Sequence, residues 1–305
     1  MTTGEKVKEK TKCGYVAVVG RPNSGKSTLV NAFLESPLSI VNSKGQTTRN
    51  KVLGVLTKGA SQIVFLDTPG MFKAKNVLHS FMVSEIKSAL NDADIILHLI
   101  DAGKIILEKL QITEENYKNI FLKKKRIFVL NKIDLKSQQE VIKDIEILEK
   151  EMGYKNIIPV SSLNKFNLDS LYKVIIKNLP ISEFLFDKDT LTDRSERFFV
   201  SEIIRNKIFE LYRDELPFSS FVEVREFKDR PERKILIRAD ITVEEESQKK
   251  IIIGKNGLKL KKLGKEARIE LEKFLQREVY LELFLKVRKK WRENQIILRN
   301  MYKSS

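Results

Sequence analysis

The stretch of sequence that decides the fold reads Gly20-Arg21-Pro22-Asn23-Ser24-Gly25-Lys26-Ser27-Thr28. It matches the phosphate-loop pattern, with an apolar run at 15–20 before it and a helical pattern at 26–34 after it. Glycines let backbone amides surround a phosphate group, and the N-terminus of the helix adds its positive dipole. We therefore predict that these nine residues bind a nucleotide, that Lys26 reaches its β- and γ-phosphates, and that Ser27 ligates Mg²⁺.

A second motif indicates which base is bound. Asn131-Lys132-Ile133-Asp134 directly follows the apolar run at 127–130. A carboxylate at Asp134 can accept both N1–H and N2–H of guanine, whereas adenine has no such pair of donors. Alone the tetrapeptide is a weak signal, because Asn and Asp after a strand are usually turn formers; with a phosphate loop upstream it becomes strong. Ser161 and Ser162, again after an apolar run, are expected to complete a guanine pocket.

A third motif, Asp67-Thr68-Pro69-Gly70, follows the apolar run at 63–66. Asp67 is expected to hold Mg²⁺ through water, and the amide of Gly70 to bind the γ-phosphate. Between this motif and the phosphate loop, the polar stretch at 44–49 can supply a threonine to Mg²⁺. Thr48 is our choice and Thr47 is the alternative. The motifs occur in the order expected of a translation-factor-class GTPase.

The first half of the chain is predicted to be an α/β, doubly wound, mostly parallel sheet. Apolar runs alternate with helical patterns, which is typical of that architecture. The helical patterns cover 80–90, 113–122, 139–151 and 168–178. After residue 190 the order becomes helix, strand, strand, helix, helix, strand, which indicates a smaller α+β domain. We expect a basic tail at 1–12, a nucleotide-binding domain at 13–182, a linker at 183–194 and a second domain at 195–305.

Composition excludes several classes of protein. A chain of 305 residues with a single cysteine, Cys13, and two histidines has no disulfide framework and is poorly suited to a transition-metal centre. We expect a cytoplasmic protein with no membrane span, and we expect His98 to be a core residue with satisfied hydrogen bonds. The net charge is +16, and residues 251–305 hold 15 Lys and Arg against 6 Asp and Glu. That excess favours a polyanionic partner, although a generally basic proteome would explain it too.

Both halves together resemble the Era family of bacterial ribosome-assembly GTPases, in the Era/TrmE group. Besides the motifs above, the resemblance is carried by Gln46-Thr-Thr-Arg49, by 247–257 and by 285–292. Many relatives share the GTPase motifs, and it is their union with this C-terminal half that singles out the family. The resemblance implies a type II KH domain that binds the 3′ end of 16S ribosomal RNA during maturation of the 30S subunit. It also implies peripheral contact with the inner membrane, and we favour a monomer.

The KH resemblance identifies candidate RNA-binding residues. Gly254-Lys255-Asn256-Gly257 would be the GxxG loop, where missing side chains let the backbone approach phosphates. Lys259 and Lys262 follow on a predicted helix, and a solvated helix face is the alternative for them. A basic patch with a stacking aromatic is expected from Lys286, Arg288, Lys289, Lys290, Trp291 and Arg292. For Trp291, a core or interface position is the equally weighted alternative.

Met71 bears on the hydrolysis chemistry. It follows Gly70, at the position where Ras-like GTPases carry a glutamine that orients the attacking water. The resemblance places this chain among GTPases with a hydrophobic residue there, some of which use K⁺ held by a phosphate-loop asparagine. Asn23 is at the matching position, with a turn residue as the alternative. We expect slow, K⁺-assisted GTP hydrolysis with Lys26, Thr48, Asn23 and Gly70 as the catalytic groups, and Mg²⁺ as the cofactor.

Three functional hypotheses are left by the sequence. The first is a GTP-hydrolysing switch whose nucleotide state regulates RNA binding by the KH domain. The second is a constitutive RNA-binding protein in which GTP is structural, which an intact motif at 67–70 disfavours. The third is a signalling GTPase whose basic C-terminus contacts a membrane surface, although no clear amphipathic membrane helix is present.

Overall fold

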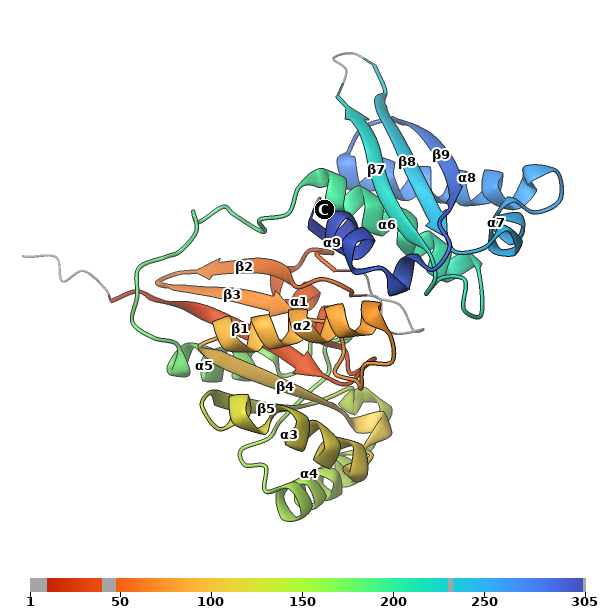
Figure 1. Ribbon diagram of the computed structural model, residues 1–305. Helices are drawn as coiled ribbons and strands as arrows, with labels where there is room; N and C mark the ends of the chain where they lie inside the picture. The colour runs from red at the N-terminus through yellow and green to blue at the C-terminus, as the bar shows by residue number, and fades with distance from the viewer. Residues whose placement is uncertain (1–9, 40–47, 230–232, 304–305) are drawn as a thin grey trace, which may run out of the picture. The chain divides into compact units, whose positions relative to one another are not determined.

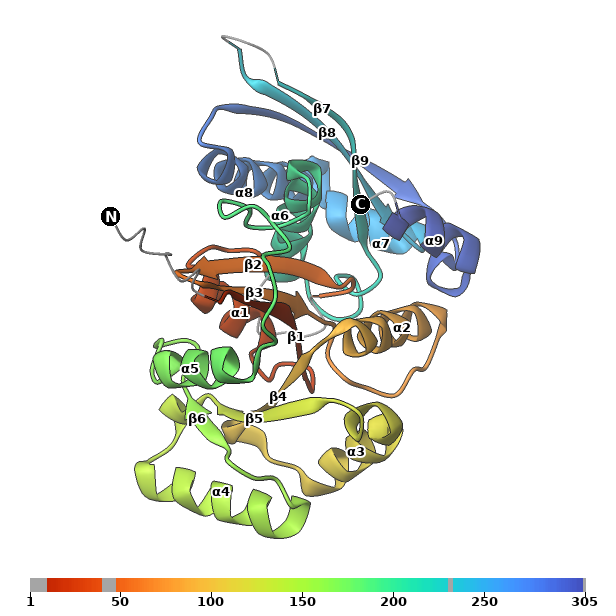
Figure 2. The same ribbon diagram turned by 90° about the vertical axis from the view of Figure 1, so that its left-hand side faces the viewer.

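A computed structural model describes residues 10–39, 48–229 and 233–303. The chain divides into two compact units, and the main boundary between them falls between Asp193 and Arg194. The elements of both units are shown in Figures 1 and 2.

The first unit is built on a six-stranded sheet in the order β2-β3-β1-β4-β5-β6. Only the pair β2–β3 is antiparallel, and the other neighbours are parallel. The predicted α/β, mostly parallel fold is thereby confirmed. The strands are β1 (Lys12–Gly20), β2 (Val52–Lys58), β3 (Ser61–Asp67), β4 (Ile95–Asp101), β5 (Lys125–Asn131) and β6 (Ile158–Val160).

Helices cover both faces of this sheet. Figure 2 shows α1 and α5 on one side and α2 and α3 on the other. The two faces follow from alternation along the buried strands: Ala17 and Val19 of β1 pack with Ile86 and Leu90 of α2. The helices are α1 (Lys26–Leu34), α2 (Val77–Asp92), α3 (Leu107–Phe121), α4 (Gln138–Met152) and α5 (Leu168–Asn178). Because parallel strands end at one edge, the motifs after β1, β3, β5 and β6 converge there.

The second unit is a three-stranded sheet with helices, in the order β7-β8-β9. Strands β7 and β8 are antiparallel with an irregularity between Val224 and Glu226, and β8 and β9 are parallel. Its core joins alternate residues of β8, such as Ile237 and Ile241, to Leu263 of α8. This is the predicted α+β order. The elements are α6 (Glu196–Leu211), β7 (Phe221–Lys228), β8 (Ile235–Val243), α7 (Glu246–Ile253), α8 (Leu258–Leu275), β9 (Val279–Val287) and α9 (Gln295–Lys303).

Within residues 10–39, 48–229 and 233–303, no helix combines the length and the apolar character that a membrane span requires.

His98 of β4 is a core residue, as predicted, but its hydrogen bonds are not satisfied. The ring lies among Phe121, Phe128 and Tyr154. Neither ring nitrogen has a hydrogen-bond partner among the described residues, and Nδ1 lies 3.7 Å from Oε1 of Glu114. Burial lowers the pKa of His98 from 6.5 to about 4, although the Glu114 carboxylate opposes the shift. The native protein therefore keeps this imidazole neutral.

This buried imidazole should make the protein acid-sensitive. Between pH 6.5 and about 4 the unfolded chain binds a proton at His98 that the native state does not bind. The contribution of neutral His98 to the free energy of unfolding is therefore fully present above pH 6.5. The free energy of unfolding falls as the pH drops below that value, by about 2 kcal/mol at pH 5. His98→Phe should remove that part of the slope. Urea unfolding followed by circular dichroism at pH 7.5 and pH 5 measures it, and equal slopes in both proteins would contradict the assignment.

Candidate functional site

The phosphate loop lies between the end of β1 and the start of α1. Gly25 caps α1 with φ 90°, and a Cβ there would lie 2.2 Å from Nδ2 of Asn131. Gly70 approaches the loop from β3, where a Cβ would lie 2.7 Å from the backbone N of Pro22. Glycine is required at both positions because another part of the site occupies the space of a side chain. Asn23 has φ 67° and is exposed, a conformation that asparagine tolerates well.

Asn131 connects two parts of the site that are far apart in sequence. Its Nδ2 donates to the carbonyl of Ser24 at 2.9 Å. Its Oδ1 accepts from the backbone N–H of Ser162 at 3.0 Å and from the Ser162 hydroxyl at 2.8 Å. The side chain is buried, so these bonds hold the phosphate loop against the segment after β6. Sequence reasoning placed Asn131 in the site but did not find this bridging role.

The residues expected to recognise the base also come together. The Ser161 hydroxyl donates to Oδ1 of Asp134 at 2.5 Å, and Asp134 itself is exposed. Lys132 has φ 64° and places its Nζ 2.7 Å from Oδ2 of Asp101 at the end of β4. Asp101 was missed from the sequence. Its position at the carboxyl end of a parallel strand, the edge that carries the other motifs, is the signal that could have found it.

Three oxygen-bearing side chains meet beside the phosphate loop. The Ser27 hydroxyl donates to Oδ2 of Asp67 at 2.7 Å and lies 3.1 Å from Oγ1 of Thr48. Oδ1 of Asp67 is buried without a hydrogen-bond partner among the described residues. Burial raises the pKa of this carboxyl, and the Ser27 hydroxyl and the Lys26 ammonium oppose the shift. Because Mg²⁺ prefers such hard oxygen ligands, the donor set and the unpaired oxygen fit that ion.

Lys26 is almost fully buried at the start of α1, and its Nζ donates to the carbonyl of Arg21 at 3.1 Å. Burial lowers its pKa to about 8; the Asp67 carboxylate opposes this and Lys132 adds to it. The ammonium is thus mostly protonated at pH 7 and is held within the loop. The alternative threonine, Thr47, lies outside the described residues.

The side chains on either side of Gly70 decide whether this segment offers a polar group to the attacking water. The Met71 side chain packs in the core with Ala17, Ile86 and Leu90, and its N–H donates to the carbonyl of Gly20 at 2.8 Å. The Thr68 hydroxyl donates to the carbonyl of Val18 at 2.8 Å, so this side chain holds the loop to β1. Met71 therefore supplies no polar group to an attacking water.

The candidate GxxG loop joins α7 to α8. Gly254 has φ 69° and ψ −179°, a region open essentially to glycine alone, and Gly257 has φ 73°. Lys255, Lys259 and Lys262 are exposed along the loop and the next helix. Arg288, Lys289 and Lys290 are exposed after β9. These six cations are available to a polyanion.

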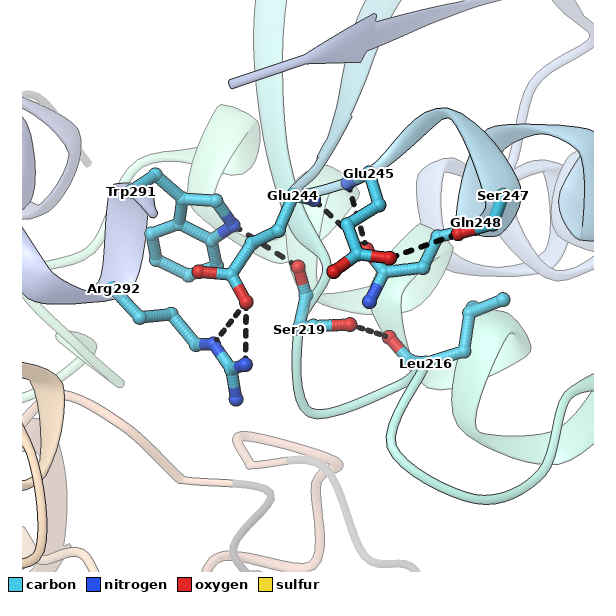
Figure 3. Close-up of polar contacts among 8 residues, drawn as sticks. All are labelled: Leu216, Ser219, Glu244, Glu245, Ser247, Gln248, Trp291 and Arg292. Atoms are coloured by element: carbon cyan, nitrogen blue, oxygen red, sulfur yellow. Dashed lines mark hydrogen bonds and ion pairs between the residues drawn. The ribbon is translucent and has the colours of Figure 1, made fainter. Parts of the chain in front are cut away.

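Trp291 corrects the sequence-based expectation of a stacking residue. It is fully buried, and its Nε1 donates to the carbonyl of Ser219 at 3.0 Å (Figure 3). Its ring centroid lies 6.0 Å from that of Phe221. A side chain enclosed by protein cannot stack on a nucleobase, so the core alternative holds.

Three of the predicted RNA-binding cations, Lys262, Lys286 and Arg292, are held in ion pairs within the second unit. Nζ of Lys262 lies 3.7 Å from Oε1 of Glu266. Nε of Arg292 donates to Oε2 of Glu244 at 2.9 Å, as Figure 3 shows. Nζ of Lys286 lies 2.5 Å from Oδ2 of Asp240. Binding a phosphate through any of the three would break or share a protein contact. The better candidates are therefore Lys255, Lys259, Arg288, Lys289 and Lys290.

Truncating Trp291 should therefore affect stability directly. Trp291→Ala is expected to lower the free energy of unfolding by about 3–5 kcal/mol, because it leaves a large cavity and an unpaired carbonyl at Ser219. Arg288→Ala, at an exposed neighbour, should leave that energy unchanged and weaken RNA binding. Denaturant unfolding by circular dichroism and RNA titration separate the two. A stable Trp291→Ala variant with poor RNA binding would restore the stacking role.

Comparison with known proteins matches both units. The family model described as 50S ribosome-binding GTPase matches residues 15–132, and the KH domain model matches residues 215–292. GTPase Era of Geobacter metallireducens is 40% identical over 293 residues, covering 94% of this chain and 96% of that protein. GTPase Era of Clostridium botulinum strain Alaska E43 is 40% identical over 291 residues, covering 95% and 98%.

Two solved structures agree over nearly the whole chain. One is a point variant of Aquifex aeolicus Era bound to GDP·AlF4⁻, and the other is Era in complex with MgGDPNP and nucleotides 1506–1542 of 16S ribosomal RNA. Each has a TM-score of 0.88 and 42% identity, and covers 96% of this chain and 99% of the other. With GTPase and KH family models on one chain and 40% identity to these relatives over nearly its whole length, the protein belongs to the Era family of GTPases.

Proposed function

We propose that this GTPase uses its nucleotide state to control binding of its KH domain to the 3′ end of 16S ribosomal RNA, in 16S processing and 30S subunit biogenesis. The related Era structure with nucleotides 1506–1542 supports the RNA partner. The six exposed cations around the GxxG loop and after β9 supply the charge that phosphate contacts need.

For hydrolysis, we assign Mg²⁺ to Ser27, Thr48 and, through water, Asp67. When bound, the ion would neutralise charge on the β- and γ-phosphates. Lys26 binds the same phosphates from the start of α1, and the Gly70 amide binds the γ-phosphate. The Asp134 carboxylate, which the Ser161 hydroxyl holds in place, accepts hydrogen bonds from the N–H donors of guanine.

We assign Asn23 to K⁺ because Met71 is turned into the core. Asn23→Gly removes the amide and suits the local φ of 67°. The parent protein should hydrolyse GTP faster in K⁺ than in Na⁺ at equal ionic strength, and the variant should lose that difference. Equal rates of the parent protein in both salts would exclude the role.

The observation that carries the coupling is the attachment of the linker to the sheet of the first unit. The backbone N–H of Val55 donates to the carbonyl of Leu191 at 2.8 Å, and the hydroxyl of Thr192 donates to the carbonyl of Leu53 at 2.7 Å. Both acceptor and donor positions on the sheet belong to β2, whose first residue, Val52, is four residues after Thr48. A contact that Thr48 makes only when Mg²⁺ and a triphosphate are bound can therefore be transmitted along the backbone to the strand that holds the linker.

Gln62 of β3 anchors the same linker further upstream. Its Oε1 accepts from the backbone N–H groups of Leu185 at 2.9 Å and Phe186 at 3.1 Å, and its Nε2 donates to the carbonyl of Phe186 at 2.8 Å. The side chain is fully buried, so loss of these bonds would leave polar groups unpaired. The linker is thus a bonded part of the first unit up to Thr192.

The test is the affinity for an oligonucleotide matching the 16S 3′ end, with GDP and with a non-hydrolysable GTP analogue. We expect tighter binding with the analogue, and a smaller difference in Thr192→Val, which keeps the shape of the side chain but not its donor. A scrambled oligonucleotide is the control. Equal affinity of the parent protein in both states would sink the coupling and leave RNA binding intact.

The second candidate function is membrane association, in which a cytoplasmic monomer contacts the inner membrane peripherally. The basic C-terminal region favours it. Binding to anionic and neutral vesicles, measured beside RNA binding across a salt series, distinguishes them. Vesicle binding without binding to the oligonucleotide would favour the membrane.

A further inference from the structure

One face of α2 is occupied by polar side chains that contact a single residue of the neighbouring segment. Oε2 of Glu85 accepts from the backbone N–H of Lys51 at 3.1 Å. Nζ of Lys51 donates to the Ser88 hydroxyl at 3.3 Å and to Oδ2 of Asp92 at 2.8 Å. The spacing of 85, 88 and 92 places these three residues on the same side of the helix. Both the main chain and the side chain of Lys51 are therefore held by α2.

Lys51 is the last residue before β2 and lies three residues after Thr48. Thr48 and the two residues between them, Arg49 and Asn50, are each less than 10% exposed. With Lys51 fixed to α2 and the residues between packed in protein, the Thr48 hydroxyl has little freedom to leave the position 3.1 Å from Ser27. Helix α2, which follows Gly70, is therefore in direct contact with the segment that carries Thr48.

We propose that Glu85 is a positioning residue for GTP hydrolysis, with Lys51 as its target: it holds the Thr48 hydroxyl at the Mg²⁺ site and links that hydroxyl to α2. The inference rests on the assignment of Thr48 to Mg²⁺ made above. Thr48 is expected to ligate Mg²⁺ when a γ-phosphate is present, and GDP has none. The contact between Glu85 and Lys51 therefore matters chiefly when a triphosphate is bound.

The contacts differ in strength. A carboxylate bonded to a main-chain amide in a half-buried position is the stronger one. Lys51 and Asp92 form a partly exposed pair, with side chains 27% and 50% accessible, so solvent weakens it. Loss of Glu85 should therefore do more than loss of the Lys51 ammonium.

The full-length protein is titrated with a fluorescent non-hydrolysable GTP analogue and with GDP, in Mg²⁺. Glu85→Ala should weaken analogue binding about tenfold and leave GDP binding within about twofold. Glu85→Gln keeps an acceptor and should recover most of the loss. Lys51→Met should cost about two- to threefold. Lys87→Ala, at an exposed position on another side of α2, is the matched control.

A double mutant distinguishes the positioning role of Glu85 from a merely structural one. If Glu85 acts through Thr48, adding Glu85→Ala to Thr48→Val should change analogue affinity no further, and the midpoints of thermal unfolding should stay close to that of the parent. Additive losses, or equal losses for GDP and the analogue, would overturn the proposal.

The proposal is also distinguishable from the assignment on which it rests. If Thr48→Val leaves the ratio of affinities for the GTP analogue and for GDP unchanged, the Mg²⁺ role of Thr48 is wrong, and the role of Glu85 is wrong with it. If Thr48→Val abolishes the preference for the analogue while Glu85→Ala does not, only the positioning role is wrong.

Discussion

Asp134→Asn is expected to lower the affinity for GTP by at least about 10³ and to raise the affinity for xanthosine triphosphate, because the specificity resides in hydrogen-bond matching. The carboxylate accepts two N–H donors from guanine, whereas an amide presents one acceptor and one donor. Xanthine carries a carbonyl where guanine carries its exocyclic amine, and so it suits the amide. Competition binding of the two triphosphates measures the switch.

The control for this change is Asp169→Asn, an exposed carboxyl in the same unit that should leave both affinities unchanged. The Ser161 hydroxyl bond to residue 134 survives because an amide oxygen still accepts it. If Asp134→Asn weakened both triphosphates equally, Asp134 would serve the loop geometry and not the base.

Lys26→Ala is expected to lower kcat by about 10² to 10³, because the ammonium stabilises charge that grows on the transferred phosphoryl group. The fall in kcat should exceed the loss of GDP affinity, since the interaction strengthens in the transition state. Single-turnover hydrolysis with saturating GTP and Mg²⁺ is the measurement. Lys104→Ala, an exposed lysine after β4, is the matched control.

The Lys26 change also removes the cation beside the buried Asp67 carboxylate. Unfolding of the nucleotide-free variant must therefore be measured in parallel, so that a folding defect is not scored as a catalytic one. An unchanged kcat with weaker binding of GDP and GTP alike would place Lys26 in ground-state binding only.

The sequence predicted the helices unevenly, and the differences have identifiable causes. The pattern at 168–178 coincides with α5, where apolar residues recur regularly enough to define one buried face. Helices α2 and α3 begin at Val77 and Leu107, before the patterns at 80–90 and 113–122. The apolar spacing already reaches into their first turns, at Leu78 and Met82 of α2 and at Leu107 and Leu110 of α3, so the ranges taken from the sequence were too short at their N-terminal ends.

Strand β2 was missed entirely. It is an edge strand with mixed exposure, and Gly54 interrupts its apolar pattern. The structure explains the glycine: a Cβ there would lie 2.5 Å from Cδ2 of Leu38 and 2.6 Å from Cδ1 of Leu34. The strand exists because it pairs with β3 and packs under α1, and neither partner is visible in the local sequence.

By itself, the sequence determined the nucleotide chemistry and the order of the two folds. Phosphate loops, GxxG loops and buried parallel strands impose local demands on residue type, so short motifs retain them. Only the tertiary structure decided what depends on partners far away in the chain. Trp291 is a core residue because the carbonyl of Ser219 receives its N–H, 72 residues earlier. Lys51 meets Glu85, and the linker meets β2, because folding brings together segments that no local pattern connects.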